Sequence, residues 1–212
     1  MADFLLIFED IPFYTKKDID KGLTPLEVYK LCSCIRETFC LSYSIRKGNN
    51  LYISLYKKLA LIKFQGDKLR FLGSDERSQE ILLNKAITKI YEINMSNIWK
   101  KSTAGIFIRK IESLRKLQHF IELISHNRII IQNNYIQGEY YLTIKQLKSL
   151  TDLNNYLFIL PDYHNGSKNP NIFAILERLS NLKFVMFPRI NKIENKLLFI
   201  NYIIDQQKSS SI

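Results

Sequence analysis

Residues 156–187 decide the fold, and they read YLFILPDYHNGSKNPNIFAILERLSNLKFVMF. Two short apolar runs, 156–160 and 183–187, flank a helical segment at 171–179. Strands that are apolar throughout are typical of parallel sheets, because helices cover both of their faces. A strand, a helix and a second strand in this order therefore predict a β-α-β unit in a parallel sheet.

The same alternation continues outward from this unit. Strands are expected at residues 51–56, 59–64, 70–72, 105–110 and 128–132, and 140–150 mixes a short strand with a helical turn. Helices are expected at 25–39, 81–90, 113–124 and 194–206. Thr24, Pro25 and Glu27 form a capping-box pattern at the start of the first helix. We therefore expect an α/β fold with a mostly parallel sheet covered by helices on both faces, as one domain over residues 1–207 with a frayed tail at 208–212.

The composition excludes a disordered chain, because 46% of the 212 residues are hydrophobic and can bury a sizeable core. Lys and Arg number 31 against 20 Asp and Glu, which gives a net charge of +11. This surplus favours a polyanionic partner, although the same charge also serves solubility. The first residues lack the basic segment and the cleavage site that a secretory signal needs. No stretch approaches the roughly 20 apolar residues that a membrane-spanning helix requires. We expect a soluble cytoplasmic protein.

The cysteines give no sign of a disulfide framework or a metal site. Cys32, Cys34 and Cys40 are odd in number and close together, and no histidine is near them in sequence. We expect them to be buried as small hydrophobic residues, and we expect no metal.

Polar loops follow two of the expected strands, after Leu160 and after Phe187. In parallel sheets, ligands bind in the crevice at the carboxyl ends of the strands. The first loop, PDYHNGSK at 161–168, is either a ligand-binding loop or an ordinary surface turn. The chain contains neither a Walker A motif nor Gly-x-Gly-x-x-Gly, so the usual phosphate-binding loops are not indicated.

Three segments in the first half carry a further pattern: LCSCIRETFCLSYSIR at 31–46, IKFQGDKLRFLGSDERS at 62–78 and WKKSTAGIFIR at 99–109. In this order they resemble the archaeal tRNA pseudouridine(54) N1-methyltransferases. The resemblance rests on a Leu-Ser-x-x-Ile-Arg motif, an Asp-Glu-Arg motif and a Trp-x-x-Ser-Thr-Pro-Gly motif, in which Ala104 stands here at the proline position. Their residues here are Leu41, Ser42, Ile45 and Arg46; Asp75, Glu76 and Arg77; and Trp99, Ser102, Thr103 and Gly105.

The resemblance implies an S-adenosylmethionine-dependent tRNA methyltransferase of the knotted SPOUT class, with a C-terminal trefoil knot, working as a homodimer. The two loops chosen from the sheet correspond to cofactor loops of that family. The cofactor-binding residues implied are Leu160, Asp162, Gly166, Phe187, Pro188, Lys192 and Leu197.

Basic residues lie in or beside the matched segments and are expected to bind RNA phosphates. They are Arg46, Lys47, Arg77, Lys100, Lys101, Arg109 and Lys110. Asp75 and Arg77 are the implied catalytic residues, although Arg77 could instead pair with Asp75 or Glu76. Trp99 is expected to pack rather than to stack on a base.

The sequence departs from the family at several acidic positions. Leu26, Glu27, Val28 and Tyr29 stand where the family has Gly-Arg-Leu-Asp, Ser44 replaces an acid, and Pro161 replaces the glycine of Gly-Asp-His. A carboxylate normally assists removal of the N1 proton, and the remaining candidates are Asp75, Asp162 and Glu27. The alternatives are an RNA-binding homologue that has lost methyl transfer, and a protein-interaction subunit.

Overall fold

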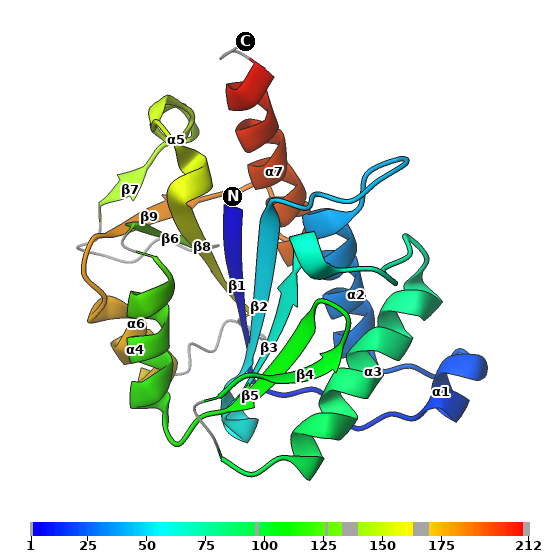
Figure 1. Cartoon of the computed structure of the whole chain (residues 1–212). Coiled ribbons are helices and arrows are strands. Elements are labelled where there is room, and N and C mark those ends of the chain that lie inside the picture. Colours follow the sequence, from blue (N-terminus) through cyan, green and yellow to red (C-terminus); the bar gives the residue numbers. More distant parts are fainter. Residues whose placement is uncertain (1, 96–97, 126, 133–139, 163–169, 210–212) are drawn as a thin grey trace.

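A computed structural model describes residues 2–95, 98–125, 127–132, 140–162 and 170–209 (Figure 1). In these ranges a nine-stranded sheet has the order β4-β5-β3-β2-β1-β8-β6-β9-β7. Its strands are β1 (Ala2–Phe8), β2 (Asn49–Leu55), β3 (Ala60–Gln65), β4 (Lys100–Thr103), β5 (Ile106–Lys110), β6 (Asn127–Gln132), β7 (Tyr141–Leu142), β8 (Tyr156–Pro161) and β9 (Leu182–Met186). Five strand pairs are parallel and three are antiparallel, which confirms the predicted mostly parallel sheet.

The sequence patterns did not identify the central strand, β1. It pairs in parallel with β2 on one side and with β8 on the other, so it joins the two halves of the sheet. On the β2 side the strands become antiparallel, whereas the β8 side is parallel throughout. The five residues Phe4–Phe8 are all buried, as expected for a strand covered on both faces.

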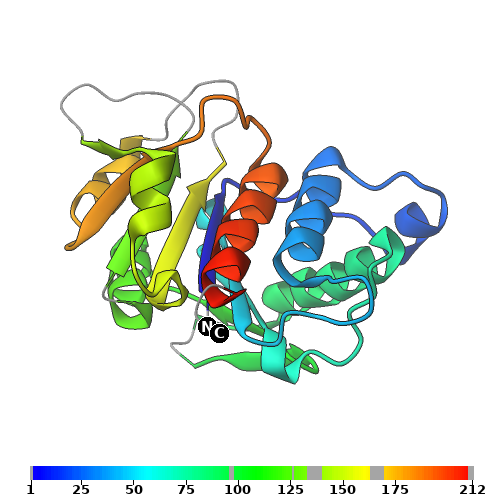
Figure 2. The ribbon, with the colours of Figure 1, turned by 90° about the horizontal axis from the view of Figure 1, so that it is seen from above.

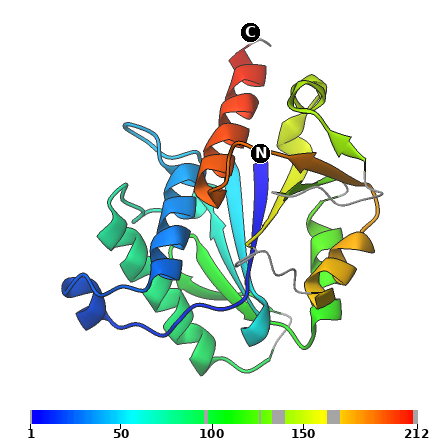
Figure 3. The same ribbon diagram turned by 180° about the vertical axis from the view of Figure 1, so that it is seen from behind.

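Helices cover both faces of the sheet, as predicted. On one face lie α2 (Leu26–Phe39), α3 (Glu76–Glu92) and α7 (Ile193–Ser209), which share one hydrophobic core with the sheet. On the other face, α4 (Leu114–Ile124) and α6 (Pro170–Glu177) bury a second core (Figures 1 and 3). The short helices α1 (Lys16–Asp20) and α5 (Ile144–Ser149) lie at the periphery. Figure 2 shows α2 and α7 side by side, and the two helices are in contact.

Two local predictions are wrong, and one strand was missed. The capping box at Thr24 does not form, because α2 begins one residue later with Pro25 as its N-cap and without a side-chain cap bond. Residues 70–72 are loop and not strand, because a 3-10 turn at Gly66–Lys68 ends β3 and leaves Phe71 exposed. The hairpin partner of β5, strand β4, was not predicted. Gly105 closes that hairpin with a positive φ of 78°, a conformation that favours glycine.

The cysteines are buried as predicted, with Cys32 and Cys34 fully inaccessible and Cys40 partly so. Cys32 and Cys34 point in different directions on α2, and both are covered because α2 packs against α3 as well as α7. Burial raises the pKa of all three thiols. Among the residues that the structure describes, no cluster of His, Cys, Asp and Glu could hold a metal ion. Nor does the described part contain a helix long and apolar enough to cross a membrane.

Candidate functional site

The first candidate site is a cavity of about 420 Å³ where β6 and β8 end and where α2 and α7 begin, here called the carboxyl-edge cavity. Its lining residues are Leu26, Tyr29, Lys30, Ser33, Ile131, Leu160, Pro161, Asp162, Asn191, Lys192, Ile193, Glu194 and Lys196. This is the edge of a parallel sheet at which ligand sites are found. The cavity therefore lies where the topology argument predicted it.

An ion pair crosses this cavity. The Lys30 ammonium on α2 lies 2.9 Å from one carboxylate oxygen of Asp162 and 3.0 Å from the other. The backbone N–H of Asp162 donates to the Ile7 carbonyl at 2.9 Å, which extends the β8 backbone beside β1 and fixes the carboxylate at the strand end. The Asp162 side chain is only 11% exposed. Its pairing with Lys30 therefore takes place in a largely desolvated position.

A second lysine, Lys196 on the first turns of α7, lines the same cavity and is 5% exposed. Burial lowers the pKa of Lys196 to about 8, and the negative charge of Asp162 partly opposes this shift. The ammonium groups of Lys30 and Lys196 are thus both attracted by the Asp162 carboxylate. Glu194 and Lys192 are also on the lining. Anionic and cationic groups of a ligand would both find a counter-charge here.

The structure brings together only some of the predicted cofactor residues. Leu160, Asp162 and Lys192 line the carboxyl-edge cavity. Phe187 and Leu197, the latter on α7 itself, are buried in the core that α7 covers. The Phe187 ring packs edge-on against Phe199, with 5.3 Å between the ring centres. Pro188 is exposed in the β9–α7 connection and is not on the cavity lining. Gly166 lies outside the described residues.

Arg46, the last residue of the first matched segment, and Lys47 beside it lie at the opposite edge of the sheet, where β1 and β2 begin. Arg46 donates to the Cys40 carbonyl at 3.2 Å and to Asp205 on α7 at 3.0 Å. Its side chain is 16% exposed, so the guanidinium ties the 40–46 turn to α7. Lys47 is exposed and lines a second cavity of about 420 Å³, here called the amino-edge cavity. Sequence reasoning could not find Asp205, which lies 159 positions from Arg46.

Asp75 and Arg77, the predicted catalytic residues, also lie outside the carboxyl-edge cavity. Asp75 is the N-cap of α3, where its carboxylate accepts the Ser78 backbone N–H at 2.8 Å. That hydrogen bond lowers the pKa of Asp75. Arg77 lies 2.6 Å from Asp20 on α1, and both side chains are about half exposed. The local pairing expected with Asp75 or Glu76 is therefore not what the structure shows, because Arg77 pairs with Asp20, 57 positions away in the chain.

The remaining predicted RNA-binding residues lie on the β4–β5 hairpin. Lys100 and Lys101 are exposed. The Arg109 guanidinium lies 5.5 Å from the centre of the Trp99 ring and 5.2 Å from that of Phe120, and burial lowers the pKa of Arg109. Trp99 packs edge-on against Phe120 at 5.9 Å, which confirms its predicted packing role.

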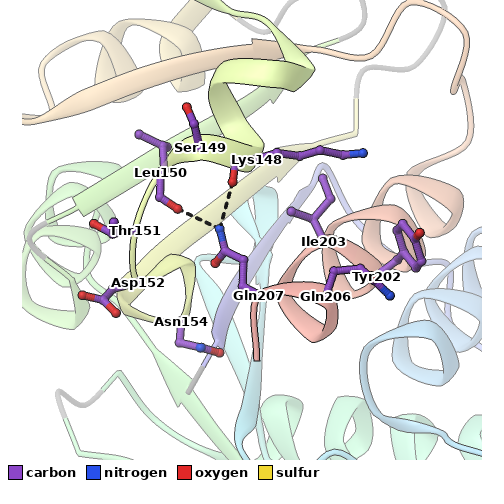
Figure 4. Close-up of a pocket in the computed structure, with 10 residues that line it drawn as sticks. All are labelled: Lys148, Ser149, Leu150, Thr151, Asp152, Asn154, Tyr202, Ile203, Gln206 and Gln207. Atoms are coloured by element: carbon purple, nitrogen blue, oxygen red, sulfur yellow. Dashed lines mark hydrogen bonds between the residues drawn. The ribbon is translucent and has the colours of Figure 1, made fainter. Parts of the chain in front are cut away.

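A third cavity, of about 750 Å³, was not predicted and lies where β8 begins (Figure 4). Gln207 at the end of α7 donates to the backbone carbonyls of Lys148 at 3.2 Å and Leu150 at 2.7 Å. The side chains around it are mostly amides, hydroxyls and apolar groups, with Lys148 and Asp152 as the charged members. These bonds fasten the last turn of α7 to the connection between α5 and β8.

Comparison with known proteins identifies relatives along most of the chain. A family model described as "Putative SAM-dependent RNA methyltransferase" matches residues 15–209. The chain is 28% identical over 185 residues to the tRNA (pseudouridine(54)-N(1))-methyltransferase of Methanococcus vannielii, covering 84% of each protein. It is 26% identical over 188 residues to the enzyme of the same name from Methanocaldococcus jannaschii, covering 86% of this chain and 85% of the relative.

Similarity of fold extends further than similarity of sequence. The structure of Nep1 from Archaeoglobus fulgidus, solved with bound S-adenosylhomocysteine, matches 98% of this chain and 99% of its own with a TM-score of 0.57. Only 10% of the aligned residues are identical, so this match concerns the fold. The family model, in contrast, spans nearly the whole chain, and the protein belongs to the SAM-dependent RNA methyltransferase family that it describes.

Proposed function

We propose that this protein transfers a methyl group from S-adenosylmethionine to tRNA, at N1 of a pseudouridine in the T-loop. The observation that carries the proposal is the carboxyl-edge cavity, which lies at the ligand-binding edge of the sheet in a chain of this family. The names of the relatives from Methanococcus vannielii and Methanocaldococcus jannaschii supply the substrate. With tRNA as substrate, the protein would act in the cytoplasm, as the sequence predicts.

The groups on the cavity lining fit S-adenosylmethionine. Its methionine part carries a carboxylate and an ammonium group, which require a cation and an anion. Lys196 and Lys192 supply the cation, and Asp162 or Glu194 supplies the anion. The apolar lining residues, among them Leu26, Ile131 and Ile193, suit the adenine ring.

When bound, the cofactor supplies a methyl group on a sulfonium for an in-line displacement, so alignment is the main task of the protein. Of the three candidate bases, Asp162 lies on the cavity, Asp75 caps α3 at the other edge, and Glu27 is not on the lining. We therefore assign to Asp162 the task of holding the N1 proton or orienting the group that takes it. Lys30 fixes the Asp162 carboxylate through two hydrogen bonds.

A homodimer is part of the proposal. Helix α7 exposes Leu198 by 48% and Tyr202 by 51%, beside a groove of about 680 Å³ that also includes Ile190 and Phe199. Within one chain, the seven residues of β1, about 20 Å of strand, separate the two edges. A catalytic role for Asp75 and Arg77 therefore requires a second copy that brings its own amino edge to the cavity. We further propose that the segment from β8 to α7 forms the trefoil knot and that residues 1–207 act as one domain.

A second function follows from the same ion pair. Lys30 occupies Asp162, and Tyr29 stands on the cavity lining where the family has an acid. If this arrangement prevents proton removal, the protein binds cofactor and tRNA without transferring the methyl group.

The test incubates the full-length protein with tRNA that carries pseudouridine in the T-loop and with S-adenosylmethionine labelled on its methyl group. We expect label in the RNA, and nucleoside mass spectrometry should identify 1-methylpseudouridine. Asp162→Asn should reduce the rate at least about 100-fold, the lower end of the range for a lost acid–base group. Asp152→Asn, in the cavity of Figure 4, is the matched control and should retain the rate. If calorimetry shows cofactor binding but no label is transferred, the protein has the second function, binding without methyl transfer. If it neither binds the cofactor nor transfers label, the proposed methyltransferase activity is refuted.

A further inference from the structure

The turn at residues 40–46 presents an aromatic ring to solvent on a rigid support. Cys40 and Ile45 form an antiparallel bridge, and the Leu41 N–H donates to the Ser44 carbonyl at 2.9 Å. Below the turn, the Arg46 N–H donates to the Phe39 carbonyl at 2.7 Å, and the Arg46 guanidinium fastens the turn to α7. Tyr43 lies at the tip and is fully exposed. The backbone around Tyr43 is therefore fixed, while its ring has no partner surface within the described part of the chain.

A second loop, residues 69–75, lies against this turn. Gln79 donates to the Gly73 carbonyl at 3.1 Å, and the Cys40 thiol approaches the same carbonyl at 3.8 Å. A Cβ at Gly73 would contact the Asp75 carboxylate and lie 2.7 Å from the Ser78 hydroxyl, so a larger residue there would displace these two side chains. Phe71 in this loop is 70% exposed. The two loops thus hold two exposed aromatic rings close to a common cavity.

The amino-edge cavity lies between these loops, and its rim is basic. Tyr43, Leu41 and Leu72 are on the lining together with Lys47 and Arg70, the two exposed cations. Nearby acids also exist. Asp75 is committed to the α3 cap, whereas Asp67 and Glu76 are exposed outside the lining. An aromatic face beside cations is the combination that binds unstacked nucleotides, because the ring stacks on the base and the cations contact phosphates.

We propose that Tyr43 and the amino-edge cavity bind an unstacked base of the tRNA loop, with Lys47 and Arg70 on the neighbouring phosphates. The inference rests on the proposed RNA substrate, and it concerns where the RNA is held and not how it is methylated. Base-paired RNA offers no free base face, so the site selects loop nucleotides over a duplex.

The experiment measures the affinity of the full-length protein for two unmodified RNAs, a hairpin with the loop sequence of the tRNA T-arm and a blunt duplex with the same stem. Tyr43→Ala should weaken hairpin binding about 10-fold, and Tyr43→Phe should remain within about twofold of the wild type. Duplex binding should not change in either variant. Lys47→Ala should weaken binding of both RNAs and lower the salt dependence by about one unit. Phe13→Ala is the control, because Phe13 is 64% exposed and packs against Tyr91 away from this cavity.

The inference is overturned if Tyr43→Ala leaves hairpin affinity within twofold, if Tyr43→Phe loses as much as Tyr43→Ala, or if the wild type binds the duplex as tightly as the hairpin. These outcomes are separable from failure of the proposed function. Loss of methyl transfer with intact, Tyr43-dependent hairpin binding refutes the enzyme and retains the RNA site. Methyl transfer that does not depend on Tyr43 retains the enzyme and refutes the site.

Discussion

Charged side chains have different roles in the carboxyl-edge cavity and in the amino-edge loops. In the cavity, Asp162 and Lys196 are nearly buried, Asp162 is paired with Lys30, and all three side chains are on the lining, where a ligand would meet them. At the amino edge, Arg46 and Asp75 are occupied by the protein itself, in a turn anchor and a helix cap. Arg46 and Asp75, from the matched motifs, therefore stabilise a turn and a helix end, whereas the sheet topology led to the carboxyl-edge cavity. Charges in the two regions should respond differently to substitution.

The largest effect is expected at Asp162. Asp162→Asn leaves the buried Lys196 and the partly buried Lys30 without their carboxylate, and breaking one side of a buried ion pair costs about 3 kcal/mol. Urea unfolding followed by circular dichroism should show this loss as a lower midpoint at unchanged slope. Asp152→Asn should change the free energy of unfolding by less than about 0.5 kcal/mol. A loss of less than about 1 kcal/mol in Asp162→Asn would mean that both lysines reach solvent freely.

A smaller loss of stability is expected at Arg46. Arg46→Ala removes hydrogen bonds to the Cys40 carbonyl and to Asp205, and charged hydrogen bonds of this kind contribute about 2 kcal/mol. Amide hydrogen exchange in residues 40–46 should accelerate, because the turn loses its attachment to α7. Asp205→Asn should cost less, since that side chain is 45% exposed. If Arg46→Ala lost RNA binding at unchanged stability and exchange, Arg46 would contact RNA directly, as the sequence predicted.

The sequence could predict these two regions only in part. Apolar runs identified β8 and β9, and the carboxyl-end argument led to the loop that contains Asp162. The partner of Asp162, however, is Lys30, 132 positions away, and no local pattern indicates a pairing over that distance. The same limit applies to β1, whose importance arises from pairing with β2 and β8. Local patterns describe elements, whereas strand pairing and ion pairs depend on the assembled chain.

Substitutions of Asp75 distinguish a helix-capping role of this residue from a catalytic role. Asp75→Ala should lower the free energy of unfolding by about 1 kcal/mol, because α3 loses its N-cap. Asp75→Asn retains an acceptor for the Ser78 N–H and should lose little. Since the folded pKa of Asp75 is lowered, its contribution is present above the unfolded pKa near 3.8 and disappears as pH falls through the folded pKa. A 100-fold loss of methyl transfer in Asp75→Asn at normal stability would instead indicate a catalytic carboxylate.

The smallest effects on stability are expected at the exposed pair of Arg77 and Asp20, where each single substitution should change the free energy of unfolding by less than about 1 kcal/mol. Their effects on RNA affinity should differ in sign. Arg77→Ala removes a phosphate contact and should lower the salt dependence of tRNA binding by about one unit. Asp20→Asn releases Arg77 from its partner and removes a negative charge, so tRNA should bind more tightly at low salt, with the gain disappearing as salt rises. If Arg77→Ala instead abolishes methyl transfer at normal tRNA affinity, Arg77 acts in the reaction. Because Arg77 is not on the lining of the carboxyl-edge cavity, it would then have to reach that cavity in a second copy.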